Sequence, residues 1–242
     1  MIGLLIWEEA PKGARQKPVA MREEILLHNR FLRAEVLRGS RTPERILHRR
    51  VLAAEKRLRK AGVTEIVLPN RFTMTEHLEG IRPVSTLPLR QALAADWLRR
   101  ELKERGLRPA DTRTAVAADR LTGEVVRTVT ALALRHRHVL LDVPYGGEEL
   151  CRSLRREYGV SLLLLAENVP QQEANAWVLF APREQIGEQA LVLPLYDEAF
   201  PMPVPVLPPA LEEKLPLGAD RLQLLTVLVR NGAIRAGTDL TF

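Results

Sequence analysis

Acidic side chains stand at the ends of two apolar runs that predict successive β-strands. Asp119 directly follows one run, and Asp142 comes near the end of the next, 23 positions later. Carboxylates at strand ends can hold ligand hydroxyls or take part in acid–base catalysis. Arg120, beside the first of them, can contact an anion. Any small-molecule site is therefore expected around these three residues.

The turn after the second carboxylate adds residues suited to a ligand. Gly146 and Gly147 allow close approach of the backbone, and Tyr145 offers a ring for stacking. Glu148 and Glu149 suit the positive end of a following helix but oppose an anionic ligand. The same residues also fit a tight strand-to-helix turn that binds nothing, and both interpretations stay open.

The elements that must position these residues alternate along the chain. Apolar strand patterns and amphipathic helix patterns follow one another between residues 112 and 165, with helices at 121–135 and 147–158. Two further strands are expected, at 177–180 and 191–195. Strand–helix alternation favours a mostly parallel sheet with right-handed crossovers. We predict an α/β fold with three layers and a core domain spanning residues 63–198.

A basic αβ element is expected to precede this core. It covers residues 1–62, begins with a strand and contains a helix that ends at Gly62. Thr42 is predicted to cap that helix and Pro43 to occupy its first position. The segment 23–38 fits either a helix or strands, and the pattern does not decide between them.

The core itself is expected to begin with a strand at 63–68 and to continue with a helix at 88–105. Residues 199–242 then form a proline-rich strap and a C-terminal helix at 220–229. Asp220 is placed to cap this last helix or to favour its start by charge.

The pattern from Ala115 onward resembles the Rossmann-like, NAD(P)-binding type of domain at the superfamily level. In that fold a G-x-G-x-x-G turn joins the first strand to a helix, and an acidic residue follows about 20 residues later. Here the glycine positions hold Ala118, Arg120 and Gly123, and Asp142 stands at the acidic position. The resemblance implies NAD(P) as the cofactor, bound by Asp119, Arg120, Gly123, Asp142, Tyr145 and Gly146. The degenerate glycine pattern favours instead a closed or altered site.

These patterns predict a Rossmann-like protein that binds a small molecule or a protein partner. No catalytic motif is recognisable, so whether the chain is an enzyme stays open, and an NAD(P)-dependent oxidoreductase is one alternative. A nucleic-acid-binding protein is another, because residues 1–60 carry 15 Lys and Arg against 7 Asp and Glu. Within the helix at 43–60, five cations fall in a sector of about 100°: Arg45, Arg49, Lys56, Arg59 and Lys60.

Other chemistries have weaker patterns. His136 and His138 share strand parity with Asp142, but basic neighbours favour a solvated strand entry, and no metal site is expected. Cys151 lies on the apolar face of its predicted helix and is expected in the core. Glu167 and Asn168 end a strand and can face the same cleft or cap a turn. No Walker loop and no G-x-S-x-G elbow is present.

Composition narrows the class further. The chain has 242 residues, a net charge of +6 and a single cysteine, so it forms no internal disulfide. No apolar run approaches the roughly 20 residues that span a bilayer. The apolar segment 1–7 is followed directly by Glu8 and Glu9, a pattern that predicts a strand and not a signal peptide. A cytoplasmic protein without a membrane segment is expected, and its oligomeric state stays open.

Overall fold

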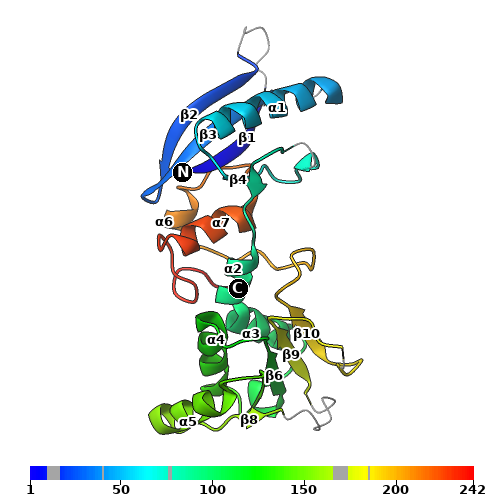
Figure 1. The fold of residues 1–242 in the computed structure, drawn as a ribbon, viewed down its shortest axis with the longest axis vertical. Coiled ribbons are helices and arrows are strands. Elements are labelled where there is room, and N and C mark those ends of the chain that lie inside the picture. Colours follow the sequence, from blue (N-terminus) through cyan, green and yellow to red (C-terminus); the bar gives the residue numbers. More distant parts are fainter. Residues whose placement is uncertain (10–16, 40, 76–77, 166–173, 185) are drawn as a thin grey trace. The chain divides into compact units, whose positions relative to one another are not determined.

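The computed structural model describes residues 1–9, 17–39, 41–75, 78–165, 174–184 and 186–242. These residues form two compact units (Figure 1). Unit 1 consists of Met1–Thr86 and Val206–Arg235, and unit 2 consists of Leu87–Pro205 and Ala236–Phe242. Each unit contains its own five-stranded sheet, and both sheets are mostly parallel. The predicted α/β fold class is confirmed.

The sheet of unit 1 has the strand order β2-β3-β1-β4-β5. Its strands are β1 Ile2–Glu9, β2 Val19–Leu26, β3 Asn29–Arg38, β4 Glu65–Val67 and β5 Arg82–Pro83. β2 and β3 form an antiparallel hairpin, and the other neighbours are parallel. Leu27 and His28 form the hairpin turn with positive φ angles of 46° and 67°, which match the twist of paired strands. The open choice for residues 23–38 is therefore decided in favour of strands.

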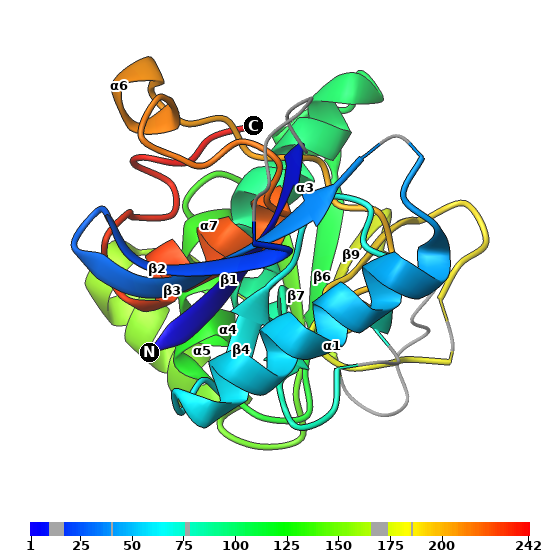
Figure 2. The same cartoon turned by 90° about the horizontal axis from the view of Figure 1, so that it is seen from above.

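Helix α1, Glu44–Lys60, packs along this sheet (Figure 2). It buries the apolar face that the sequence predicts, with Leu47, Val51, Ala54 and Leu58. The predicted cap is wrong. The N-cap residue is Pro43, whose ring has no hydrogen-bonding group, and the Thr42 hydroxyl accepts from the Gly39 amide at 2.8 Å instead of capping the helix.

Two helices near the C-terminus belong to unit 1, α6 Pro209–Glu212 and α7 Arg221–Arg230. The carboxylate of Asp220 accepts from the Gln223 amide and caps α7, as predicted. The Gln223 side chain in turn accepts from the Leu68 amide at 2.8 Å. Arg230 pairs with Glu65 of β4 at 2.6 Å. These polar contacts attach the C-terminal segment to the first sheet.

The sheet of unit 2 has the order β10-β9-β6-β7-β8, and every neighbouring pair is parallel. Its strands are β6 Arg113–Ala117, β7 His138–Asp142, β8 Leu163–Leu164, β9 Ala176–Leu179 and β10 Leu191–Pro194. The strands β6, β7 and β9 are almost wholly buried, as continuous apolar runs in a parallel sheet require.

The helices of unit 2 are α2 Leu87–Ala92, α3 Ala94–Glu104, α4 Gly123–Ala133 and α5 Gly147–Tyr158. The helix predicted at 88–105 is thus two helices that meet at Leu93. α4 packs against β7 and contacts α2 and α3. A separate apolar cluster around Ala115, Leu140 and Trp177 includes Ile186 and Val192 from the chain around β10.

The unit boundaries differ from those expected at residues 62 and 198. β4 pairs with β1 and so joins the first sheet, although the sequence groups residues 63–68 with the later strands. The chain returns to unit 1 at Val206 and leaves it again after Arg235. Strand pairing and this return are non-local, so local patterns do not reveal them. Among the described helices, none is long and apolar enough to cross a bilayer.

Candidate ligand site at the strand ends of unit 2

The order of strands in unit 2 decides where a ligand would bind. If β6 to β10 are numbered 1 to 5 in chain order, the strands lie across the sheet in the order 3-2-1-4-5. This is the strand order of the Rossmann fold. Unit 2 is Rossmann-like. In such a sheet the chain leaves β6 and β9 in opposite directions, and ligands bind beyond the carboxyl ends of the strands at this point. The ends of β6, β7 and β9 therefore define the candidate site.

An arginine after β9 connects all three strand ends. Arg183 donates from Nε to Asp142 Oδ2 at 2.6 Å and from Nη1 to Asp119 Oδ1 at 3.1 Å. It also donates from Nη2 to the Ala118 carbonyl at 3.0 Å and from Nη1 to the Pro182 carbonyl at 2.9 Å. The structure thus brings Asp119 and Asp142 together, although they come from different strand ends, by means of a residue outside the predicted set.

The ion pairs differ in their exposure to solvent. The side chains of Arg183 and Asp142 are 18% and 20% exposed, whereas that of Asp119 is 76% exposed. Burial by itself lowers the pKa of Arg183, but hydrogen bonds and attraction from Asp142 and Asp119 raise it above its ordinary value. Arg183 therefore stays charged and neutralises Asp142 more strongly than Asp119, because water screens the exposed pair.

Arg183 has little capacity left for a phosphate. A guanidinium carries five N–H donors, and Arg183 uses four of them on the two carboxylates and two carbonyls. Its role in this structure is to fix the carboxylates. Asp142 keeps Oδ1, which accepts no hydrogen bond in the described part of the chain, and that oxygen is available to a ligand.

The turn between β6 and α4 contains the three residues at the glycine positions of the Rossmann pattern, Ala118, Arg120 and Gly123. The carbonyl of Ala118 is taken by Arg183, and the Ala118 amide donates to the Asp142 carbonyl at 3.0 Å. Arg120 is exposed, and its side chain has no polar partner among the described residues. Gly123 begins α4, and a Cβ placed there would meet only Arg127 Nη1, at 3.7 Å. The backbone at the first turn of α4 is therefore open to solvent.

In the turn between β7 and α5, close packing requires both glycines. A Cβ at Gly146 would lie 2.9 Å from Leu121, and one at Gly147 would lie 2.8 Å from Leu164. Gly146 also has a φ of 78°, which a residue with a side chain rarely adopts. Tyr145 is 83% exposed, so its ring is free to stack on a ligand. The turn thus needs its glycines without any ligand, whereas the tyrosine has no packing role.

Sequence reasoning missed Arg183. It follows β9 by four residues and lies 41 positions from Asp142 in the sequence. No motif marks it. The available signal was indirect: two carboxylates predicted at neighbouring strand ends need a cation, and Arg183 follows the next strand of the sheet.

The remaining predicted residues do not join this site. His136 is buried before β7, where its Nδ1 lies 3.1 Å from the Thr114 hydroxyl. Burial, with help from Arg99 and Arg135, lowers the pKa of His136. No group of three metal-ligating side chains occurs among the described residues. Glu167 and Asn168 lie outside the described residues.

Cys151 lies on α5 and is only partly buried, so the prediction that it belongs to the core is only partly confirmed. Burial raises the pKa of its thiol, which disfavours the reactive thiolate.

The predicted basic face of α1 is exposed. Arg45, Arg49, Lys56, Arg59 and Lys60 all face solvent. Other arginines of the helix serve the sheet instead: Arg57 donates to the Val19 carbonyl at 2.9 Å, and Arg50 donates to the Leu37 carbonyl. The helix therefore divides its cations between its own sheet and its outer surface.

Comparisons with known proteins find similarity at the level of solved structures. No protein-family model and no curated protein matches the chain. A D-isomer-specific 2-hydroxyacid dehydrogenase from Lactobacillus delbrueckii ssp. bulgaricus, solved with NAD, matches at 14% identity over 55% of this chain, with a TM-score of 0.25. The D-lactate dehydrogenase of Lactobacillus jensenii with NAD+ matches at 15% identity over 55%, with a TM-score of 0.26.

L-tryptophan dehydrogenase from Nostoc punctiforme matches at 11% identity over 61% of this chain, with a TM-score of 0.29. The chain covers 45%, 46% and 44% of these three proteins in turn, less than half of each.

Proposed function

We propose that the strand-end site of unit 2 binds a small molecule of the mononucleotide type and that the protein acts by binding, without catalysis. Such a ligand combines a ring, sugar hydroxyls and a single phosphate. The observation that carries the proposal is the carboxylate of Asp142, which Arg183 fixes at the end of β7 through one oxygen only. The other oxygen is the natural acceptor for a sugar hydroxyl.

The phosphate would bind over the start of α4. Arg120 supplies an exposed guanidinium there, and Gly123 leaves room. The first amides of a helix and its dipole favour an anion at this end. The ring would stack on Tyr145, the exposed aromatic of the neighbouring turn.

A dinucleotide fits these residues less well. Its pyrophosphate needs close approach to the backbone between the first strand and helix, where this chain has Ala118 and Asp119. The carboxylate of Asp119 repels a second phosphate, and the Ala118 carbonyl is occupied by Arg183. The proposal therefore favours one phosphate over two.

Calorimetric titration of the full-length protein with AMP, adenosine and NAD tests the proposal. AMP is expected to bind more tightly than adenosine or NAD. Asp142→Asn should weaken AMP about tenfold, the effect of one charged hydrogen bond. Arg120→Gln should bring AMP to the level of adenosine, whereas Arg137→Gln, an exposed control on the same unit, should change nothing.

The rival oxidoreductase function predicts the opposite order. A nicotinamide cofactor would then bind more tightly than AMP, and Arg120→Gly would improve its binding because it restores a glycine of the phosphate turn. Tighter binding of NAD by the wild-type protein, enhanced further by Arg120→Gly, would overturn the mononucleotide proposal.

The outer face of α1 supports a second candidate function, binding to the phosphate backbone of nucleic acid. Its five exposed cations are Arg45, Arg49, Lys56, Arg59 and Lys60. Among the described residues, Arg59 alone of these five pairs with an acidic side chain of the helix, that of the buried Glu55, at 3.4 Å. The 15 residue steps from Arg45 to Lys60 correspond to about 22 Å along the helix, enough to follow several phosphates.

Binding of a fluorescent DNA duplex at several salt concentrations tests this second candidate. The logarithm of the affinity should fall linearly with the logarithm of the salt concentration. The double variant Arg49→Glu, Lys56→Glu should abolish the binding. A matched reversal of Arg152 and Arg155, exposed on α5, should leave it intact. Equal loss in both variants would show a general charge effect and contradict a specific role of α1.

A further inference from the structure

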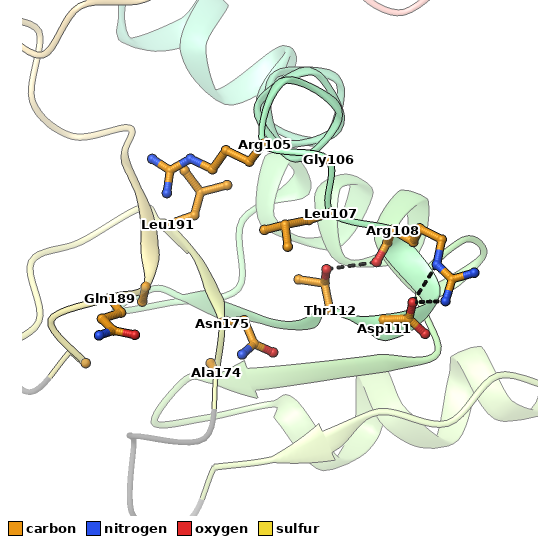
Figure 3. Close-up of a pocket in the computed structure, with 12 residues that line it drawn as sticks. Arg105, Gly106, Leu107, Arg108, Asp111, Thr112, Ala174, Asn175, Gln189 and Leu191 are labelled. Atoms are coloured by element: carbon orange, nitrogen blue, oxygen red, sulfur yellow. Dashed lines mark hydrogen bonds and ion pairs between the residues drawn. The ribbon is translucent and has the colours of Figure 1, made fainter.

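A cavity of about 520 Å³ opens at the opposite end of the unit 2 sheet (Figure 3). It lies at the amino ends of β6, β9 and β10 and below the end of α3. Its lining includes Arg105, Leu107, Thr112, Asn175, Gln189 and Leu191. The volume falls within the range of sites for small organic ligands, about 300–1,000 Å³. None of these residues belongs to the strand-end site.

Most polar groups around the cavity are already satisfied. The Arg108 guanidinium donates to Asp111 Oδ2 at 2.6 Å from Nε, and its Nη2 also lies 2.6 Å from that oxygen. The Thr112 hydroxyl donates to the Arg108 carbonyl at 2.9 Å. Asn175 Oδ1 accepts from the Arg113 amide at 3.1 Å. These groups therefore bond to one another at the amino ends of the strands and offer few free donors or acceptors to a ligand.

Two polar side chains of the lining take part in none of these contacts. The Arg105 guanidinium and the Gln189 amide are exposed, and neither has a side-chain partner in the described part of the chain. Figure 3 shows both on the β10 side of the cavity, away from the Arg108–Asp111 pair. Because that pair is neutral as a whole, the unpaired charge of Arg105 makes the cavity cationic.

Apolar surface lies beside these donors. Leu107 is 42% exposed, and Figure 3 places it between Arg105 and Thr112. The backbone fixes it there, because Gly106 ends α3 with a φ of 68° and the Leu107 amide donates to the Leu102 carbonyl at 2.8 Å. Leu191 adds a buried apolar wall. A rigidly held, half-exposed leucine beside a free arginine suits a ligand with an apolar body and an anionic end.

We propose that this cavity binds a small organic carboxylate. Its carboxylate pairs with Arg105 and accepts from the Gln189 amide, and its apolar body covers Leu107 and Leu191. The planar guanidinium can meet both carboxylate oxygens, which gives the contact direction as well as strength.

Two probes of equal shape separate the contribution of charge from that of apolar contact. 4-Phenylbutyrate carries the carboxylate, and 4-phenylbutanamide replaces it with a neutral amide. Each is titrated into the ¹⁵N-labelled full-length protein while the backbone amide signals are followed by NMR. The acid should bind about tenfold more tightly than the amide, as expected for one charged contact. It should shift the amides of Leu107 and Leu191.

Variants then assign the contacts. Arg105→Gln should remove the preference for the acid and leave the amide unaffected, and Leu107→Ser should weaken both probes. Arg137→Gln is the control and should change neither. AMP binding at the strand ends should survive Arg105→Gln, so failure of this proposal is separable from failure of the mononucleotide site.

Several results would overturn the carboxylate proposal. The acid and the amide could bind the wild-type protein equally, or the preference for the acid could persist in Arg105→Gln. Shifts confined to the strand ends around Asp142, or no shifts at millimolar acid, would equally contradict it. The NMR spectrum of each variant shows directly that it is folded.

Discussion

Replacing Arg183 by alanine should destabilise unit 2, because its carboxylates at the strand ends lose their cation. The variant leaves Asp142, which is 20% exposed, without its cation, and frees the Ala118 carbonyl. Hydrogen bonds to a charged partner contribute about 1.5–3 kcal/mol each. The half-buried contact with Asp142 should dominate, because the 76% exposed Asp119 adds less than about 0.5 kcal/mol in water. We expect a loss of about 2 kcal/mol in the free energy of unfolding.

Urea unfolding followed by tryptophan fluorescence measures this loss. Trp97 and Trp177 are fully buried in unit 2, whereas Trp7 belongs to unit 1. A Trp7→Phe background therefore restricts the signal to unit 2. Arg120→Ala removes an exposed arginine from the same turn and should change the stability by less than about 0.5 kcal/mol.

A double-mutant cycle measures the coupling between Arg183 and each carboxylate. Arg183→Ala and Asp142→Asn should be strongly non-additive, with a coupling energy of about 1–2 kcal/mol. The corresponding cycle with Asp119→Asn should give almost none. Additive effects of Arg183→Ala and Asp142→Asn, or equal coupling to both carboxylates, would refute the view that Arg183 chiefly fixes Asp142.

Three further predictions concern stability. Folding lowers the pKa of His136, so as the pH falls the imidazole is protonated in the unfolded chain before it is protonated in the folded protein. Stability should therefore fall as the pH drops below 6.5, by up to about 1.4 kcal/mol per pH unit, and His136→Gln should flatten this slope in urea titrations at several pH values. Gly147→Ala should cost about 1–3 kcal/mol because its Cβ meets Leu164 at 2.8 Å, whereas Gly123→Ala, which has open surroundings, should not destabilise in thermal unfolding. Asp220→Ala should lower the stability of unit 1 by about 1 kcal/mol in urea unfolding followed through Trp7, and Asp220→Asn should retain most of it.

The sequence predicts most elements of unit 2 because their signals are local. The helices expected at 121–135 and 147–158 correspond to α4 and α5, and β7 is a short apolar run. The carboxylates Asp119 and Asp142 follow from the ends of these strands. Each of these features depends on a few adjacent residues, so a single sequence suffices.

The remaining features depend on pairing between distant segments. β4 has three residues, and nothing in their pattern indicates pairing with β1 rather than with the later strands. Thr42 is a good capping residue in isolation, but the Gly39 amide takes its hydroxyl. Arg183 is one of 30 arginines in the chain, and only the meeting of three strand ends gives it a role.

NMR mapping of AMP on the ¹⁵N-labelled full-length protein shows directly whether a mononucleotide binds at the strand ends. We expect saturable shifts of the amides of Gly123, Glu124 and Tyr145, which lie around the proposed phosphate and ring positions. The amides of Leu107 and Leu191, at the other end of the sheet, should stay in place. Absence of saturable shifts, or shifts confined to that other end, would contradict a mononucleotide site at the strand ends of unit 2.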